Sequence, residues 1–160
     1  MRVPLTTGLP PTLPGTCSIT SQPVDVYKRQ TLWRVSNHTS LDGTGGLRAS
    51  GRWHNRGKRI VYCATNPATA LLEILVHAEI DIQDIPVTIR YLEIEAPDSI
   101  AIESLDISAG AGWQPEKSRR AGDEWLISKR SALLRVPSVI VPATWNVLMN
   151  PAHLESGRCV

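Results

Sequence analysis

The chain has 160 residues, 42% of them hydrophobic and 20% charged, and its formal net charge is +2. Its length and composition are those of one globular domain, and so small a net charge argues against a general binder of polyanions. Three cysteines without a C-x-x-C pair provide neither a disulfide framework nor a zinc ribbon, so a reducing, cytoplasmic setting is expected. The apolar runs are too short to span a membrane, and the first residues lack the apolar core of a signal peptide.

Both ends of the chain look foreign to the domain. Residues 1–30 are rich in Pro, Thr and Ser, and Asp25–Gln30 (DVYKRQ) resembles the translation of a transposase end sequence used to prepare sequencing libraries. This segment is expected to be a disordered arm or an artefact. Residues 154–160 (LESGRCV) follow abruptly and are expected to be a foreign or out-of-frame tail. The domain is therefore expected at residues 31–153.

Strands and helices mix along this domain without strict alternation, which favours an α+β fold with a mixed β-sheet and flanking helices. A long loop with four glycines is expected at Asn37–Gly51, and one helix, or two short ones separated by Gly122, at Glu116–Lys129. Short runs of β-forming residues predict strands at Thr31–Ser36, Arg59–Ala64, Val87–Ala96, within residues 99–106, and at Pro137–Pro142.

The clearest helix is expected at Asn66–Glu79, with Asn66 as its N-cap and Pro67 in the first helical position. Its predicted buried stripe consists of Leu71, Leu72, Leu75 and Val76. Glu73 lies on a flank of this helix, where it either faces a pocket or pairs with His77 in solvent.

The loop before the second predicted strand is strongly basic. Glycine lets a backbone approach a ligand closely, and the arginine fork binds phosphate in a bidentate manner. A phosphate-bearing ligand is therefore indicated, with solvated surface charges as the alternative. Neither a dinucleotide fingerprint nor a Walker loop is present. The basic residues are Arg48, Arg52, Arg56, Lys58 and Arg59.

Other reactive side chains give weaker signals. Tyr62 is either a ligand contact or a core residue with a satisfied hydroxyl, and Cys63 lies in an apolar strand where an inert thiol is expected. The four histidines lack metal-ligand spacing, so no metal site is expected.

Five motifs together resemble the RES-domain family over residues 31–153. They are LWR (32–34), GGLRASGRW (45–53), IVY (60–62), ALLEILVH (70–77) and VPSVIVP (136–142). The family pattern usually continues into a further strand after the NPAH stretch, so the domain is expected to be truncated at its C-terminal end.

The resemblance implies a fold like that of ADP-ribosyltransferases and a bacterial toxin that degrades NAD⁺ as its substrate, with no other cofactor. The implied partner is an Xre-type antitoxin, and a homodimer within a larger toxin–antitoxin complex is compatible with it. The family's catalytic arginine, tyrosine and glutamate correspond to Arg52, Tyr62 and Glu73. Its substrate-binding polar positions correspond to Arg34, Ser131 and Asn146.

These residues predict a mechanism in which the nicotinamide–ribose bond is cleaved. Arg34 and Arg52 would hold the phosphates, Tyr62 would stack on the nicotinamide or its ribose, and Glu73 would stabilise an oxocarbenium-like transition state. The acceptor of the ADP-ribosyl group is left open between water, phosphate and a protein. A non-catalytic phosphate- or nucleic-acid-binding module and an inactive fragment are the alternatives, although the low net charge argues against direct contact with nucleic acid.

Overall fold

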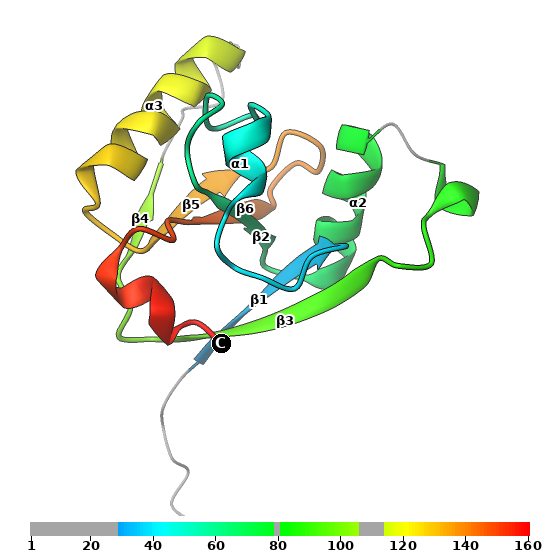
Figure 1. Ribbon diagram of the computed structural model, residues 1–160, viewed down its shortest axis with the longest axis horizontal. Coiled ribbons are helices and arrows are strands. Elements are labelled where there is room, and N and C mark those ends of the chain that lie inside the picture. Colours follow the sequence, from blue (N-terminus) through cyan, green and yellow to red (C-terminus); the bar gives the residue numbers. More distant parts are fainter. Residues whose placement is uncertain (1–28, 79–80, 106–113) are drawn as a thin grey trace, which may run out of the picture.

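The computed structural model describes residues 29–78, 81–105 and 114–160, in which six strands form one mixed sheet (Figure 1). The strand order is β3-β1-β2-β6-β5-β4; β4 and β5 are parallel and all other neighbours are antiparallel. The strands are β1 (Arg29–Ser36), β2 (Val61–Ala64), β3 (Arg90–Pro97), β4 (Ile102–Ser104), β5 (Leu133–Pro137) and β6 (Trp145–Met149). The helices are α1 (Gly45–Arg48), α2 (Pro67–Ala78) and α3 (Pro115–Ser128), with 3₁₀ helices η1 (Ile82–Asp84) and η2 (Leu154–Arg158). The predicted α+β class is confirmed.

Helices α2 and α3 cover one face of the sheet at its two ends, with α1 and its loop between them (Figure 1). Trp125 of α3 packs against Leu134 and Leu148, while Ala70 of α2 packs against Val35. The opposite face has its own apolar cluster. That cluster contains Leu32, Val61, Cys63, Ile94, Leu133, Val147, Met149 and Cys159. None of the described helices is long and apolar enough to cross a bilayer.

The sheet is weakly joined between β1 and β2. Strand β1 pairs with β3 over its whole length, from Arg29 to Ser36, but with β2 only through Trp33 and Ala64. Beyond Trp33 the two strands diverge, which leaves the side chains at the end of β1 facing a gap in the sheet.

Helix α2 has the predicted N-cap, since Asn66 Oδ1 accepts the N–H of Thr69 at 2.8 Å. The predicted apolar stripe is wrong, because Leu72 and Val76 are 42% and 54% exposed while Thr69 and Ala70 are buried. The helix packs Ala70, Leu71 and Ile74 against the sheet, so only part of the predicted stripe faces it.

The strand predicted at Pro137–Pro142 is also wrong. Strand β5 ends at Pro137, and the following loop is turned by Ser138, whose hydroxyl accepts the N–H groups of Ile140 and Val141, each at 3.1 Å. The apolar side chains of this segment are typical of a strand, so the turn was not predicted from the sequence. Strand β6 was not predicted either.

Both ends of the described part of the chain take part in the sheet. Arg29 and Gln30 already belong to β1, while the rest of the segment expected to be disordered or artefactual lies outside the described residues. Residues 154–160, expected to be a foreign or out-of-frame tail, are packed against the fold. Cys159 is buried in the core, and the backbone of Val160 exchanges two hydrogen bonds with Glu95, at 2.7 and 3.1 Å.

Candidate active site

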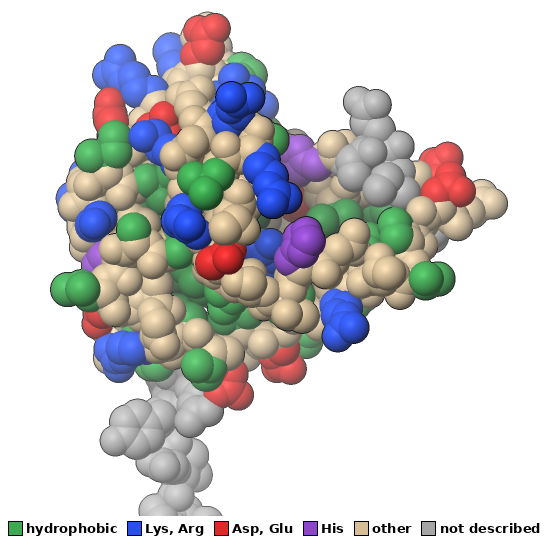
Figure 2. All heavy atoms as spheres, viewed as in Figure 1, with side chains coloured by type: hydrophobic (Ala, Val, Ile, Leu, Met, Phe, Trp, Pro, Cys, Tyr) green, Lys and Arg blue, Asp and Glu red, His purple; other side chains and the backbone are tan. Residues whose placement is uncertain are grey.

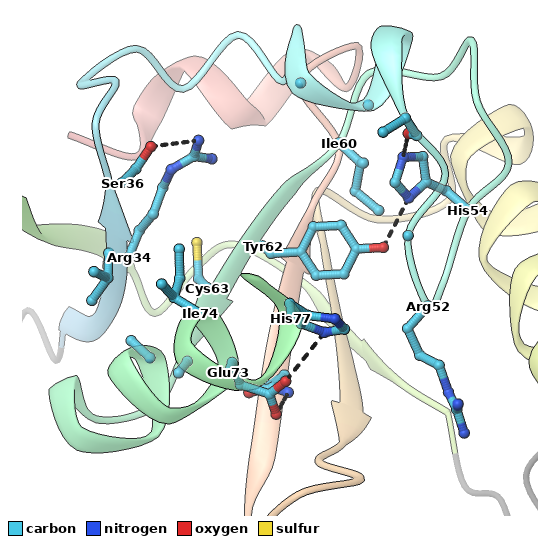
Figure 3. A pocket seen from close by; sticks show the side chains of 18 of the residues that line it. Arg34, Ser36, Arg52, His54, Ile60, Tyr62, Cys63, Glu73, Ile74 and His77 are labelled. Carbon is cyan, nitrogen blue, oxygen red and sulfur yellow. Dashed lines mark hydrogen bonds and ion pairs between the residues drawn. The ribbon is translucent and has the colours of Figure 1, made fainter. Parts of the chain in front are cut away.

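A cavity of about 450 Å³ opens where β1 and β2 diverge (Figure 3). Its walls come from the end of β1, residues 45–54, β2, α2 and β6. Its volume falls within the range of small-molecule sites. The lining includes five of the six residues expected from sequence, namely Arg34, Arg52, Tyr62, Glu73 and Asn146.

Arg34 projects from β1 into this cavity (Figure 3). Its Nη2 donates to Ser36 Oγ at 3.3 Å, whereas its buried Nε finds no hydrogen-bond partner among the described residues. Burial lowers the pKa of the guanidinium below its usual value, and the residue stays charged because that value is so high. A buried charged donor without a protein acceptor is well suited to an anionic ligand.

Glu73 lies on the cavity wall with one oxygen tightly held. Its Oε1 accepts from Asn146 Nδ2 at 2.6 Å and from Ser138 Oγ at 2.8 Å, while Oε2 lies 3.6 Å from His77 Nε2. The side chain is 16% exposed, against 56% for His77. The carboxylate is therefore fixed in orientation at the cavity wall. Its use of Ser138 was missed from sequence, because that residue lies 65 positions away in a segment expected to be a strand.

Tyr62 projects from β2, with its hydroxyl bound on the side of the basic loop (Figure 3). The hydroxyl accepts the N–H of Trp53 at 3.1 Å and lies 2.8 Å from Nδ1 of His54. Burial raises the pKa of Tyr62, so the phenol stays protonated. His54 is only 3% exposed, and sequence patterns gave no role to it.

The loop that carries Arg52 is attached to α3 through its backbone. Arg119 Nε donates to the carbonyl of Gly51 at 3.0 Å. The Asp123 carboxylate accepts from the backbone N–H and the side-chain amide of Asn55, at 3.1 and 2.8 Å. These contacts on both sides of Arg52 fix the path of the loop past the cavity.

Gly122 allows α3 to approach this loop closely. A Cβ at this position would overlap the carbonyl of Trp53, which is itself 2% exposed. The helix continues through Gly122, so one helix is present and this glycine serves packing rather than termination.

Ser131, the sixth expected site residue, is not brought to the cavity. It is 4% exposed, and its hydroxyl accepts from Trp125 Nε1 and donates to the Leu133 carbonyl, both at 2.9 Å. Its position holds α3 against β5.

Cys63 lines the cavity from the opposite face of β2, and burial raises the pKa of its thiol to about 12. A protonated thiol of this kind is a poor nucleophile. The described residues contain no cluster of three His, Cys, Asp or Glu side chains that could hold a metal ion.

Basic side chains gather over α1 and the loop that follows it, next to a hollow in the surface (Figure 2). Arg48, Arg56 and Arg59 are exposed there, and Arg59 Nη1 donates to the Asp42 carbonyl at 3.0 Å. The positive charge of this loop thus lies mainly outside the cavity, whereas Arg34 and Arg52 supply the positive charge of its lining.

Comparison with solved structures supports the α+β architecture. A chain of the crystal structure of the M. tuberculosis MbcT-MbcA toxin–antitoxin complex matches with a TM-score of 0.58. The match covers 77% of this chain and 74% of that chain at 16% identity, so it shows a shared fold.

The family described as RES domain matches residues 31–160, and the chain belongs to that family. It is 50% identical over 127 residues to Toxin Res of Pseudomonas putida (strain KT2440), covering 78% of this chain and 87% of the relative. It is 37% identical over 137 residues to the Prs ADP-ribosylating toxin of Sphingobium sp. (strain YBL2), covering 78% and 84%. Toxin Res of Photorhabdus laumondii subsp. laumondii is 37% identical over 117 residues, covering 71% and 74%.

Proposed function

We propose that the chain is the toxin of a bacterial toxin–antitoxin pair and that it cleaves the nicotinamide–ribose bond of NAD⁺. The names of its relatives support the toxin role. The observation that carries the chemistry is the meeting of an arginine with a buried Nε, a tyrosine ring and an oriented carboxylate in one cavity. These are Arg34, Tyr62 and Glu73.

The two arginines of the cavity lining supply positive charge for the phosphates of a dinucleotide. Arg34 has a buried Nε that lacks an acceptor among the described residues, and Arg52 lies on a loop held in place by α3. Charge-assisted hydrogen bonds to phosphate are stronger than neutral ones, and a fixed donor loses little entropy on binding. In this proposal Arg34 and Arg52 orient the dinucleotide by its phosphates.

The nicotinamide end of the substrate carries positive charge, which suits Tyr62 and Glu73 of the lining. The cationic nicotinamide is favoured over the face of Tyr62, an interaction of about 0.5–2 kcal/mol. Cleavage of its bond to ribose develops oxocarbenium-like charge, and Glu73 stabilises that charge without having to reorient, since Asn146 and Ser138 already hold its Oε1. Nicotinamide leaves with the bonding electron pair, and the acceptor then bonds to the ribose carbon.

The acceptor is a protein group in the transferase version of this reaction, in line with the name of the Sphingobium relative. Water would give a glycohydrolase, and phosphate would give phosphorolysis. Mass spectrometry of the products separates the three: free ADP-ribose, a phosphorylated ADP-ribose, or a protein whose mass rises by one ADP-ribosyl group. The partner in this proposal is an antitoxin of the Xre type, whose co-expression should restore growth.

The decisive measurement is nicotinamide release from NAD⁺ by the purified chain. Arg34→Gln removes one charged hydrogen-bond donor to phosphate, so KM should rise by roughly 10- to 100-fold. Arg120→Gln is the matched control, because Arg120 is exposed on α3 and pairs only with Glu124, at 3.0 Å, among the contacts described. Absence of nicotinamide release at all pH values would refute the proposed reaction, and equal KM values for the two variants would refute the role of Arg34.

A further inference from the structure

His54 is held by hydrogen bonds at both ring nitrogens inside the loop that faces the cavity. Nε2 lies 3.1 Å from the carbonyl of Ala49, and Nδ1 lies 2.8 Å from the Tyr62 hydroxyl. A carbonyl can only accept, so Nε2 carries the hydrogen and Nδ1 of the neutral ring accepts from the phenol. The phenol oxygen in turn accepts the Trp53 N–H, at 3.1 Å.

The glycines of this loop make room for the imidazole. A Cβ on Gly46 would lie 2.9 Å from His54 Nε2, and one on Gly51 would lie 2.8 Å from His54 Cε1 and 2.5 Å from the Tyr62 hydroxyl. The glycine-rich sequence was expected to permit close approach of a ligand. Gly46 and Gly51 do line the cavity, and they also leave room for the His54–Tyr62 pair.

We propose that His54 is a positioning residue that fixes the Tyr62 ring at the cavity wall by accepting its hydroxyl hydrogen. The proposal rests on the proposed function, in which that ring faces the nicotinamide. The backbone of Tyr62 belongs to β2 and its hydroxyl is bound by His54, so both ends of the side chain are held in place. Without the second anchor the ring can move away from its stacking position, and substrate binding weakens.

Only neutral His54 can accept the phenol hydrogen, because a protonated Nδ1 is itself a donor. The groups with charge or a titratable proton that face it are Tyr62 on β2, and Arg119 and Asp123 on α3. Burial is the largest influence and lowers the pKa of His54, with Arg119 acting in the same direction and Asp123 opposing it. Activity should therefore decline in acid only below the ordinary pKa of histidine.

The test compares nicotinamide release by wild type, His54→Leu, His54→Gln, Tyr62→Phe and the His54→Leu/Tyr62→Phe double variant. Loss of one hydrogen bond should lower kcat/KM by about tenfold in His54→Leu, mainly through KM. The kcat/KM of the double variant should be no lower than that of the less active single variant, because both changes break the same hydrogen bond. Glutamine can both donate and accept, so His54→Gln should recover much of the loss while lacking the acid limb of the pH profile.

The control is His38→Leu, which alters an exposed histidine outside the cavity lining. Unchanged kcat/KM in His54→Leu, or effects that multiply in the double variant, would overturn the positioning role while leaving NAD⁺ cleavage intact. If the wild type releases no nicotinamide, NMR of the imidazole nitrogens still tests the hydrogen bond between His54 and Tyr62. A proton on Nε2 and a pKa that rises in Tyr62→Phe support the hydrogen bond, and equal pKa values in the two proteins overturn it.

Discussion

Replacing Glu73 by glutamine is the sharpest test of the carboxylate. Glutamine has the same shape, and its carbonyl oxygen can still accept from Asn146 and Ser138, which bind Glu73 Oε1 at 2.6 and 2.8 Å. The substitution removes the negative charge and leaves the packing of α2 in place. A loss of activity would therefore report on charge rather than on folding.

The size of the expected loss follows from the partial burial of this side chain. At 16% exposure Glu73 lies near the protein surface, where an effective dielectric constant of about 20 applies. A full positive charge about 4 Å away would then be stabilised by about 4 kcal/mol. Each 1.36 kcal/mol is about a tenfold change in rate, so kcat should fall by roughly a thousandfold while KM changes little.

Single-turnover nicotinamide release measures this loss, with circular dichroism as the check on folding. Glu116→Gln is the matched control, because Glu116 is exposed in the first turn of α3 and should leave kcat unchanged. A folded Glu73→Gln protein with a kcat within threefold of wild type would refute the electrostatic role. Expression in cells gives a second readout, since the variant should no longer arrest growth.

Three further outcomes are expected. Asp123→Ala removes both hydrogen bonds to Asn55, so the loop carrying Arg52 should become more mobile and KM for NAD⁺ should rise several-fold. Initial rates over a range of NAD⁺ concentrations measure this KM, and an unchanged value would contradict the role of α3. At pH 8 about one in ten thousand thiols with a pKa of about 12 is ionised, so iodoacetamide should modify Cys63 only after denaturation. Peptide mass spectrometry measures the modification, and rapid labelling of the native protein would contradict the burial of Cys63. Burial lowers the folded-state pKa of His54 below 6.5, so its contribution to the free energy of unfolding should be complete above about pH 6.5 and lost as the pH falls through the folded-state pKa. Urea unfolding from pH 7.5 to 4.5 should therefore show a smaller loss of stability in acid for His54→Gln than for wild type. Identical pH dependence in the two proteins would contradict the shift.

Local signals in the sequence predicted the elements that depend on local chemistry. The helix at Pro67–Ala78 follows its Asn66 cap, and the first strand was expected within two residues of its observed start. The stripe on that helix failed because exposure depends on what the sheet offers. Glu73 is satisfied by Asn146, 73 positions away, so a polar side chain faces inward while Leu72 faces solvent.

The candidate site shows the same division. Arg34, Arg52 and Tyr62 were recognised because they lie in short motifs, and the structure places them on one cavity. His54 stands in the same basic loop but becomes significant only when β2 carries the Tyr62 hydroxyl against it. Ser131 was expected at the site from the same family resemblance, yet its hydroxyl bonds to Trp125 of α3 and Leu133 of β5.

Only one residue pair, Trp33 with Ala64, joins β1 to β2, so the cavity lies along a seam between two parts of the sheet. Arg34 belongs to the β3–β1 part, whereas Tyr62 and Asn146 belong to the β2–β6–β5–β4 part. A dinucleotide that contacts Arg34 and Tyr62 together would bridge the seam and act as a noncovalent cross-link between the two parts. Substrate binding and the rigidity of the sheet would then be thermodynamically coupled, so that part of the binding free energy is used to hold the molecule together.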